Sequence, residues 1–129
     1  MRASAIPFIP FFLFFALAAC TEDPASTDGV NVRVFNDSPF PLDEVKLQPG
    51  EAGTNLYLDI APQAYSVYQP FPFTYRYAEI TVYIAEDSLQ IIPIDYVGEE
   101  RYESGNYTFR LTVGGTGEPE ELIFEFLQD

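Results

Sequence analysis

Most of the chain alternates apolar and polar positions with a period of two. The valines Val30, Val32 and Val34 fall on one face of the segment 30–35. The residues Tyr107, Phe109, Leu111 and Val113 do the same in the segment 107–113. Because successive side chains of a strand point to opposite faces, this pattern predicts β-strands with one buried and one solvated face.

Turn residues divide the pattern into seven or eight short strands. Strands are expected at 30–35, 43–48, 56–60, 64–69, 80–85, 89–94, 107–113 and 122–126, with Val45, Leu47, Leu56, Leu58 and Ile60 among the apolar positions. Residues 86–88 are the expected turn of the clearest hairpin. The prolines of the segment 70–77 cannot donate to a ladder and predict an edge or crossover. No segment after Cys20 shows helical periodicity, so the fold class is all-β, an antiparallel β-sandwich of seven or eight strands.

The segment 103–109, Glu-Ser-Gly-Asn-Tyr-Thr-Phe, is similar to the tyrosine corner of immunoglobulin domains. It also resembles the Pro-Gly-x-Tyr turn of transthyretin-like sandwiches. The resemblance implies an immunoglobulin-like or transthyretin-like sandwich in which the Tyr107 hydroxyl bonds back to the preceding loop. Phe109 stands where the immunoglobulin family has a Cys, and the chain has no Trp, so no immunoglobulin disulfide core is expected.

The first nineteen residues have the pattern of a secretory signal. Arg2 supplies the positive start, the segment 5–17 supplies an apolar core, and Ala18 and Ala19 are small residues suited to cleavage. An uncleaved transmembrane anchor is the first alternative, but it needs about 20 apolar residues. Cleavage before an ordinary residue is the second.

The segment Leu17-Ala18-Ala19-Cys20 resembles the lipobox of bacterial lipoproteins. The resemblance implies cleavage before Cys20, diacylglycerol on its sulfur and a fatty acyl group, such as palmitate, on its amine. Residues 1–19 are then the signal peptide, 20–29 a flexible tether and 30–129 the folded domain. Thr21, where many inner-membrane lipoproteins have Asp, favours the outer membrane. The whole chain resembles small Gram-negative lipoproteins, so the expected location is the cell envelope, on its periplasmic or surface side.

Composition excludes several classes of function. The net charge of −14 would repel nucleic acid backbones and anionic lipid headgroups. The chain has no His, and therefore lacks the usual general base and the usual metal ligand. We expect no enzyme, no catalytic residue and no cofactor.

The aromatic segment contains the best candidates for a binding site. Phe71, Phe73, Tyr75 and Tyr77 would give a large contact area at low entropic cost if exposed. The alternative is that these rings fill the core of the sandwich or cap its end.

Acidic residues between strands suggest a second, weaker candidate. Asp95, Glu99, Glu100 and Glu103 offer oxygen ligands for Ca²⁺. Their spacing matches no EF-hand or repeat-type calcium loop, and the alternative is a solvated loop that holds no metal.

Together these features predict a membrane-anchored envelope lipoprotein that is a non-enzymatic interaction or accessory module. Its expected partners are the membrane, through the lipid on Cys20, and an envelope protein or a glycan. The alternative function is the binding of a small ligand or glycan by surface Tyr and Phe residues. A concave aromatic pocket would favour that alternative, whereas a flat aromatic strip would favour a protein partner.

Overall fold

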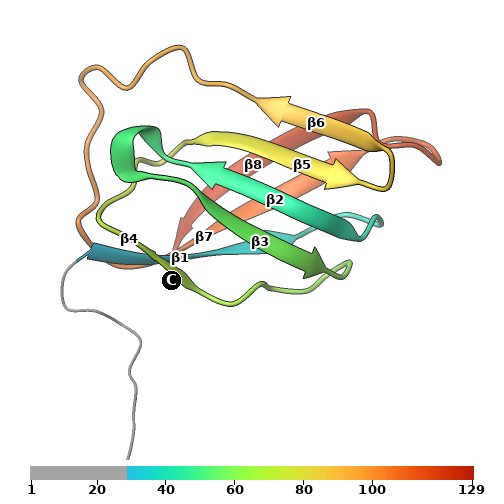
Figure 1. The fold of residues 1–129 in the computed structure, drawn as a ribbon, viewed down its shortest axis with the longest axis horizontal. Helices are drawn as coiled ribbons and strands as arrows, with labels where there is room; N and C mark the ends of the chain where they lie inside the picture. The colour runs from blue at the N-terminus through green and yellow to red at the C-terminus, as the bar shows by residue number, and fades with distance from the viewer. Residues whose placement is uncertain (1–28) are drawn as a thin grey trace, which may run out of the picture.

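The computed structural model describes residues 29–129, and these form two four-stranded sheets packed face to face (Figure 1). The strands are β1 (Gly29–Asn36), β2 (Leu42–Gln48), β3 (Asn55–Ile60), β4 (Gln69–Phe71), β5 (Glu79–Ile84), β6 (Asp87–Ile91), β7 (Ser104–Gly114) and β8 (Glu121–Gln128). A single 3₁₀ turn, Gly50–Ala52, lies between β2 and β3. The predicted all-β sandwich is therefore confirmed, with eight strands.

The first sheet has the order β4-β1-β7-β8. The pairs β1–β4 and β7–β8 are antiparallel, as expected. The central pair β1–β7 is parallel, with Gly29 beside Ser104 and Asn36 beside Leu111. Alternation along a strand reports which face is buried but not the direction of its neighbour, so this departure from an antiparallel sheet left no mark in the pattern.

The second sheet has the order β3-β2-β5-β6, and all its pairs are antiparallel. The predicted hairpin is β5–β6, with Ile84 paired to Asp87. Its loop is therefore Ala85-Glu86 rather than residues 86–88, and Ala85 has a positive φ of 54°. Tight hairpin loops favour positive φ because it matches the twist of the two strands.

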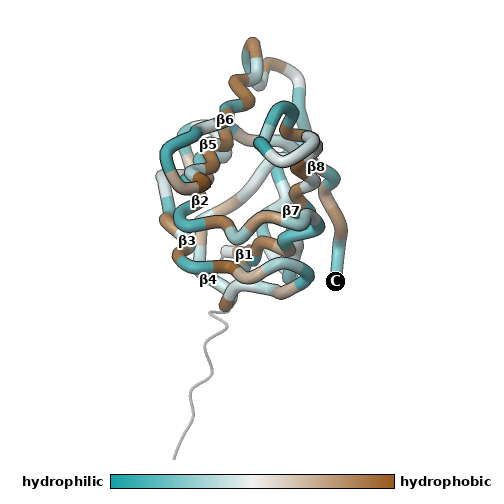
Figure 2. The backbone as a smooth tube through the Cα atoms, turned by 90° about the vertical axis from the view of Figure 1, so that its right-hand side faces the viewer, coloured by the Kyte–Doolittle hydropathy of each residue, from teal (hydrophilic) through white to brown (hydrophobic). Residues whose placement is uncertain are grey.

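The core lies between the sheets and contains the alternating positions of the central strands. Val30, Val32 and Val34 of β1, Val45 and Leu47 of β2, and Phe109 and Leu111 of β7 are at most 1% exposed. Burial of such side chains is the main favourable term in folding, at about 1.5–3 kcal/mol each. Figure 2 shows the two layers end-on, with the strands coloured by hydropathy.

The strand expected at 56–60 is confirmed as β3, but its apolar positions do not share one buried face. Tyr57 is buried at 1% exposure, whereas Leu56 and Leu58 are 47% and 60% exposed. Ile60 is buried as expected, because Asp59, with a positive φ of 52°, breaks the alternation between Leu58 and Ile60. The side chain that β3 buries between the sheets at this point is therefore Tyr57, and the two neighbouring leucines face solvent.

The segment 65–71 runs along the β1 edge of the first sheet. The strand expected at 64–69 is reduced to one bridge between Phe35 and Tyr65. The regular strand, β4, starts at Gln69 and contains Pro70. It lies at the edge of its sheet, as its proline requires.

The resemblance to a tyrosine corner predicted a specific hydrogen bond. The Tyr107 hydroxyl donates to the Ser104 carbonyl oxygen at 2.7 Å, and the Tyr107 ring is only 4% exposed. The predicted hydrogen bond from the Tyr107 hydroxyl back to the preceding loop is therefore confirmed.

The leader, Cys20 and residues 21–28 of the tether lie outside the described residues. Within residues 29–129, no helix is long and apolar enough to cross a membrane.

Candidate functional site

The four aromatic candidates do not form a flat strip on the surface. Phe71 of β4 and Tyr75 are buried, at 4% and 5% exposure. Phe73 is half-buried, with the Arg101 guanidinium carbon 4.0 Å from its ring centroid. The interpretation that these rings fill the core or cap its end therefore describes Phe71 and Tyr75. Tyr77 lines an open hollow, and the edge of the Tyr75 ring lines a second one.

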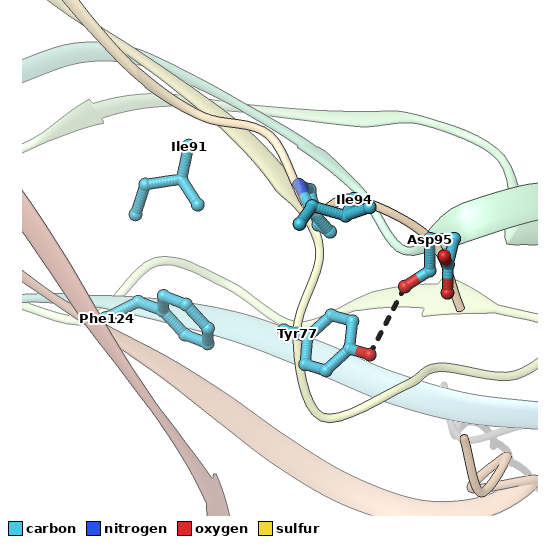
Figure 3. A pocket seen from close by; sticks show the side chains of 6 residues that line it. Tyr77, Ile91, Ile94, Asp95 and Phe124 are labelled. Atoms are coloured by element: carbon cyan, nitrogen blue, oxygen red, sulfur yellow. Dashed lines mark hydrogen bonds between the residues drawn. The ribbon is translucent and has the colours of Figure 1, made fainter. Parts of the chain in front are cut away.

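That hollow is a groove of about 490 Å³ between the edge strands β6 and β8. Its lining residues are Tyr77, Ile91, Pro93, Ile94, Asp95 and Phe124. Figure 3 shows Ile91 and Phe124 on opposite sides, with the Tyr77 hydroxyl donating to the Asp95 carbonyl oxygen at 3.3 Å. On this side of the sandwich, the half-buried Phe124 ring of β8 faces the end of β6. Hereafter it is called the β6–β8 groove.

A stack of three tyrosines joins the β6–β8 groove to a second hollow. The ring centroids of Tyr75 and Tyr96 are 4.5 Å apart, and those of Tyr77 and Tyr96 are 5.4 Å apart. Burial raises the pKa of the Tyr96 and Tyr77 hydroxyls above the usual value. Both hydroxyls therefore stay protonated to a higher pH than a free tyrosine and remain hydrogen-bond donors.

The second hollow, of about 550 Å³, lies across residues 93–95 and includes Gln48, Glu51 and Glu79 in its lining. Its walls are more polar than those of the β6–β8 groove. Because Pro93, Ile94 and Asp95 line both hollows, the segment after β6 is the wall between them.

This segment projects from the body of the sandwich and is apolar (Figures 1 and 2). Ile92, Ile94 and Val97 are 64%, 98% and 86% exposed. They are called here the apolar loop. The sequence predicted a long loop from residue 95 to residue 105 but assigned residues 89–94 to a strand. It therefore missed the start of the loop, although Pro93 and the loss of alternation at Ile91-Ile92 were signals that the ladder ends at Ile91.

The acidic candidates are not brought together into a cation site. Within the described residues, no group of three or more Asp, Glu, His or Cys side chains is placed to hold a metal ion. The Glu99 carboxylate lies 3.7 Å from Nε of Arg76, and the Asp95 carboxylate accepts the Val97 amide at 3.1 Å. Glu100 and Glu103 are exposed on the loop. These carboxylates shape and solvate the loop.

The free edge of β8 also adjoins the β6–β8 groove and was not predicted as a site. β8 pairs with β7 on one side and is the last strand of its sheet. Its side chains Leu122, Phe124 and Phe126 are half-buried, and Ile123 is 53% exposed. The alternation of its sequence predicted the strand, but whether a strand lies at an edge depends on pairing that alternation does not encode.

Comparison with known proteins supports the fold alone. No protein-family model matches the chain, and no curated protein matches it. Among solved structures, the chain is similar to a protein from Eubacterium rectale determined by NMR, with a TM-score of 0.54 and 7% sequence identity. The match covers 81% of this chain and 94% of that one. The chain thus has a β-sandwich domain structurally similar to that of the E. rectale protein.

Proposed function

We propose that this chain is a membrane-anchored lipoprotein of the cell envelope, and that its sandwich is a non-enzymatic interaction module. In this proposal Cys20 is the lipid attachment point, and the outer membrane is the favoured location. The partner is an envelope protein that binds across the apolar loop and the β6–β8 groove. The leader sequence supports the location, and the structure of the domain supports the mode of binding.

The observation that supports the interaction is the exposure of the apolar loop. Three aliphatic side chains, of which Ile94 is 98% exposed, stand beside a groove lined by Ile91 and Phe124. Contiguous apolar surface of this kind marks interaction sites in soluble domains, because its exposure to water is unfavourable. The absence of His from the chain supports a role without catalysis.

The experiment is affinity purification after cross-linking in intact envelopes. Wild-type protein is compared with Ile94→Asp, which places a charge on the apolar loop. The control is Leu58→Asp, since Leu58 is 60% exposed on β3, in the other sheet from β8. We expect Ile94→Asp to reduce recovery of the partner by about tenfold or more and Leu58→Asp to leave it unchanged. Recovery of the wild-type protein alone at native abundance would refute the proposal.

The second candidate function is binding of a small ligand or glycan. Its support is the volume of the β6–β8 groove, about 490 Å³, which lies within the range of about 300–1,000 Å³ typical of small-molecule sites. Tyr77 and Phe124 would provide the aromatic contacts. Glycan-array binding that Phe124→Ala abolishes and Val97→Asp leaves intact would favour this candidate over a protein partner, because Val97 is exposed on the apolar loop but does not line the groove.

A further inference from the structure

Among residues 29–129, no strand pairs with the outer edge of β8, so the backbone groups on that edge have no partner strand there. Asp129 donates its amide to the Asn106 carbonyl oxygen at 2.9 Å, so the backbone of residue 129 points toward β7. In an antiparallel ladder the backbone groups of alternate residues point to alternate sides. Leu122, Phe124 and Phe126 therefore direct their amide and carbonyl groups away from β7, to the open side of the sheet.

The two edges of this sheet differ in how well they resist pairing. The opposite edge strand, β4, is three residues long and contains Pro70. β8 is eight residues long and contains neither Pro nor Gly. Natural sheets block their edges with short strands or proline, because a long regular edge accepts another strand. The β4 edge is therefore blocked by its short length and its proline, whereas the β8 edge has neither feature.

The β6–β8 groove lies directly beside this open edge. Phe124 is the middle of β8, and it lines the groove opposite Ile91. A strand added to β8 would direct alternate side chains over the same face as Phe124, into the groove. Strand addition gains affinity from backbone hydrogen bonds and specificity from pockets for alternate side chains. The edge of β8 offers the backbone groups, and the β6–β8 groove offers the pocket for side chains.

The negative charge on β8 favours an added strand that carries basic residues. Glu121 and Glu125 are exposed on the outer face of β8, and the chain carries a net charge of −14. The nearby cation, Arg110, is already bonded to Asp37 and Glu125. Opposite charges across a strand pair stabilise it and like charges destabilise it. A strand with Lys or Arg at its outward positions is therefore favoured over a second copy of this acidic chain.

We propose that the free edge of β8 binds an extended segment of the partner protein by strand addition. Aliphatic residues of that segment enter the β6–β8 groove, and its alternate residues are basic. This inference rests on the proposed interaction function and names the partner segment by its chemistry.

The test uses the full chain in detergent and a synthetic peptide of alternating lysine and valine, about the length of β8. One N-methylated form of the peptide carries the methyl groups on every valine nitrogen and another on every lysine nitrogen. These forms keep charge and hydrophobicity but each blocks one edge of the peptide. We expect the unmodified peptide to bind and one of the two methylated forms to bind about tenfold or more weakly. If the strand adds antiparallel to β8, the form methylated at valine loses affinity. If it adds parallel, the form methylated at lysine loses affinity. Equal binding of both methylated forms, or no binding of the unmodified peptide, would overturn the proposal.

A matched pair of variants tests the protein side. Leu122→Pro removes an amide on the open side of β8, and Leu122→Val keeps it. With thermal unfolding showing that both variants fold, we expect only Leu122→Pro to weaken peptide binding, by about tenfold. Equal binding by the two variants would contradict strand addition. A dimer of the wild-type chain that Leu122→Pro dissociates would assign the edge to a second copy and overturn the choice of partner.

The outcomes for the edge and for the function are separable. If Ile94→Asp abolishes recovery of the envelope partner but Leu122→Pro does not, the interaction function stands and the edge proposal fails. If the peptide binds through one edge but the envelope yields no partner, the edge binds strands and the proposed function fails.

Discussion

The Tyr57 hydroxyl donates a hydrogen bond to the Val32 carbonyl oxygen at 2.8 Å. Tyr57 belongs to β3 of one sheet and Val32 to β1 of the other, so this bond joins the two layers inside the core. Both residues are at most 1% exposed. Burial raises the pKa of the Tyr57 hydroxyl well above its usual range, because the charged form would lose its hydration.

Replacement of Tyr57 by Phe removes the donor and leaves the Val32 carbonyl without it. We expect Tyr57→Phe to lower the free energy of unfolding by about 1–3 kcal/mol at neutral pH, measured by urea titration. The control is Tyr83→Phe, since Tyr83 is 36% exposed. Equal stability of wild type and Tyr57→Phe would show that the bond contributes nothing net.

The same residue predicts a dependence on alkaline pH. The pKa of Tyr57 is raised in the folded state above the unfolded value of about 10. Its contribution is therefore fully present below that pH and is lost as the pH rises toward the folded pKa, because the unfolded chain releases the proton first. We expect wild type to lose stability more steeply than Tyr57→Phe above about pH 10. Parallel curves for the two proteins would contradict this prediction.

The tyrosine corner is a separate source of stability. Tyr107→Phe keeps the ring that packs in the core but removes the hydroxyl that reaches the Ser104 carbonyl. We expect a loss of about 1 kcal/mol in the free energy of unfolding, measured by guanidinium titration. Because the ring remains, the variant should keep the wild-type denaturant slope, and a changed slope would indicate that more than one hydrogen bond is affected.

The pair formed by Asp37 and Arg110 predicts a dependence on acid pH. The Arg110 guanidinium donates from Nε to the Asp37 carboxylate at 2.9 Å, and this bond holds the pKa of Asp37 below its usual value. A lowered folded-state pKa stabilises the fold above the unfolded value of about 4, and this contribution is lost as the pH falls. We expect Asp37→Asn to unfold with a shallower pH dependence below about pH 4, measured by circular dichroism. Arg110→Gln should reproduce the effect, and a steeper dependence in either variant would contradict it.

The lipid anchor is tested at Cys20 by mass spectrometry and membrane fractionation. We expect wild-type chain to begin at Cys20 with fatty acyl groups and to fractionate with membranes, because two or more chains hold a protein stably in a bilayer. Cys20→Ser should lack the acyl groups and leave the membrane fraction. Unchanged processing and fractionation of Cys20→Ser, with no acyl groups on wild type, would refute the location.

Sequence reasoning succeeded where one local rule determined the outcome. The period-two pattern identified β1, β2, β5 and β7, and the prolines of the segment 70–77 identified an edge. The corner at Tyr107 followed from a short resemblance whose hydrogen bond is made within three residues. Each of these features depends on residues close together in the chain.

The failures all depend on contacts between distant residues. Leu56, Leu58 and Ile60 predicted the strand β3, but the left-handed conformation at Asp59 and the bond from Tyr57 to β1 determine which of its faces is buried. The end of β6 at Ile91 had a local signal in Pro93, but the open edge of β8 depends on the order of strands in space. Alternation gives no information on that order, so the β6–β8 groove could not be predicted from it.

The proline in β4 limits how this sandwich can associate through its first sheet. In the proposed mode of binding a strand adds at β8, whereas addition at β4 is disfavoured. The first sheet of each molecule therefore has one edge that accepts a strand and one edge that does not. Two such molecules, or one molecule and a foreign strand, complete the pairing and leave no further site in that sheet. Fibrous polymerisation along this direction is thereby prevented, while a single partner strand can still bind.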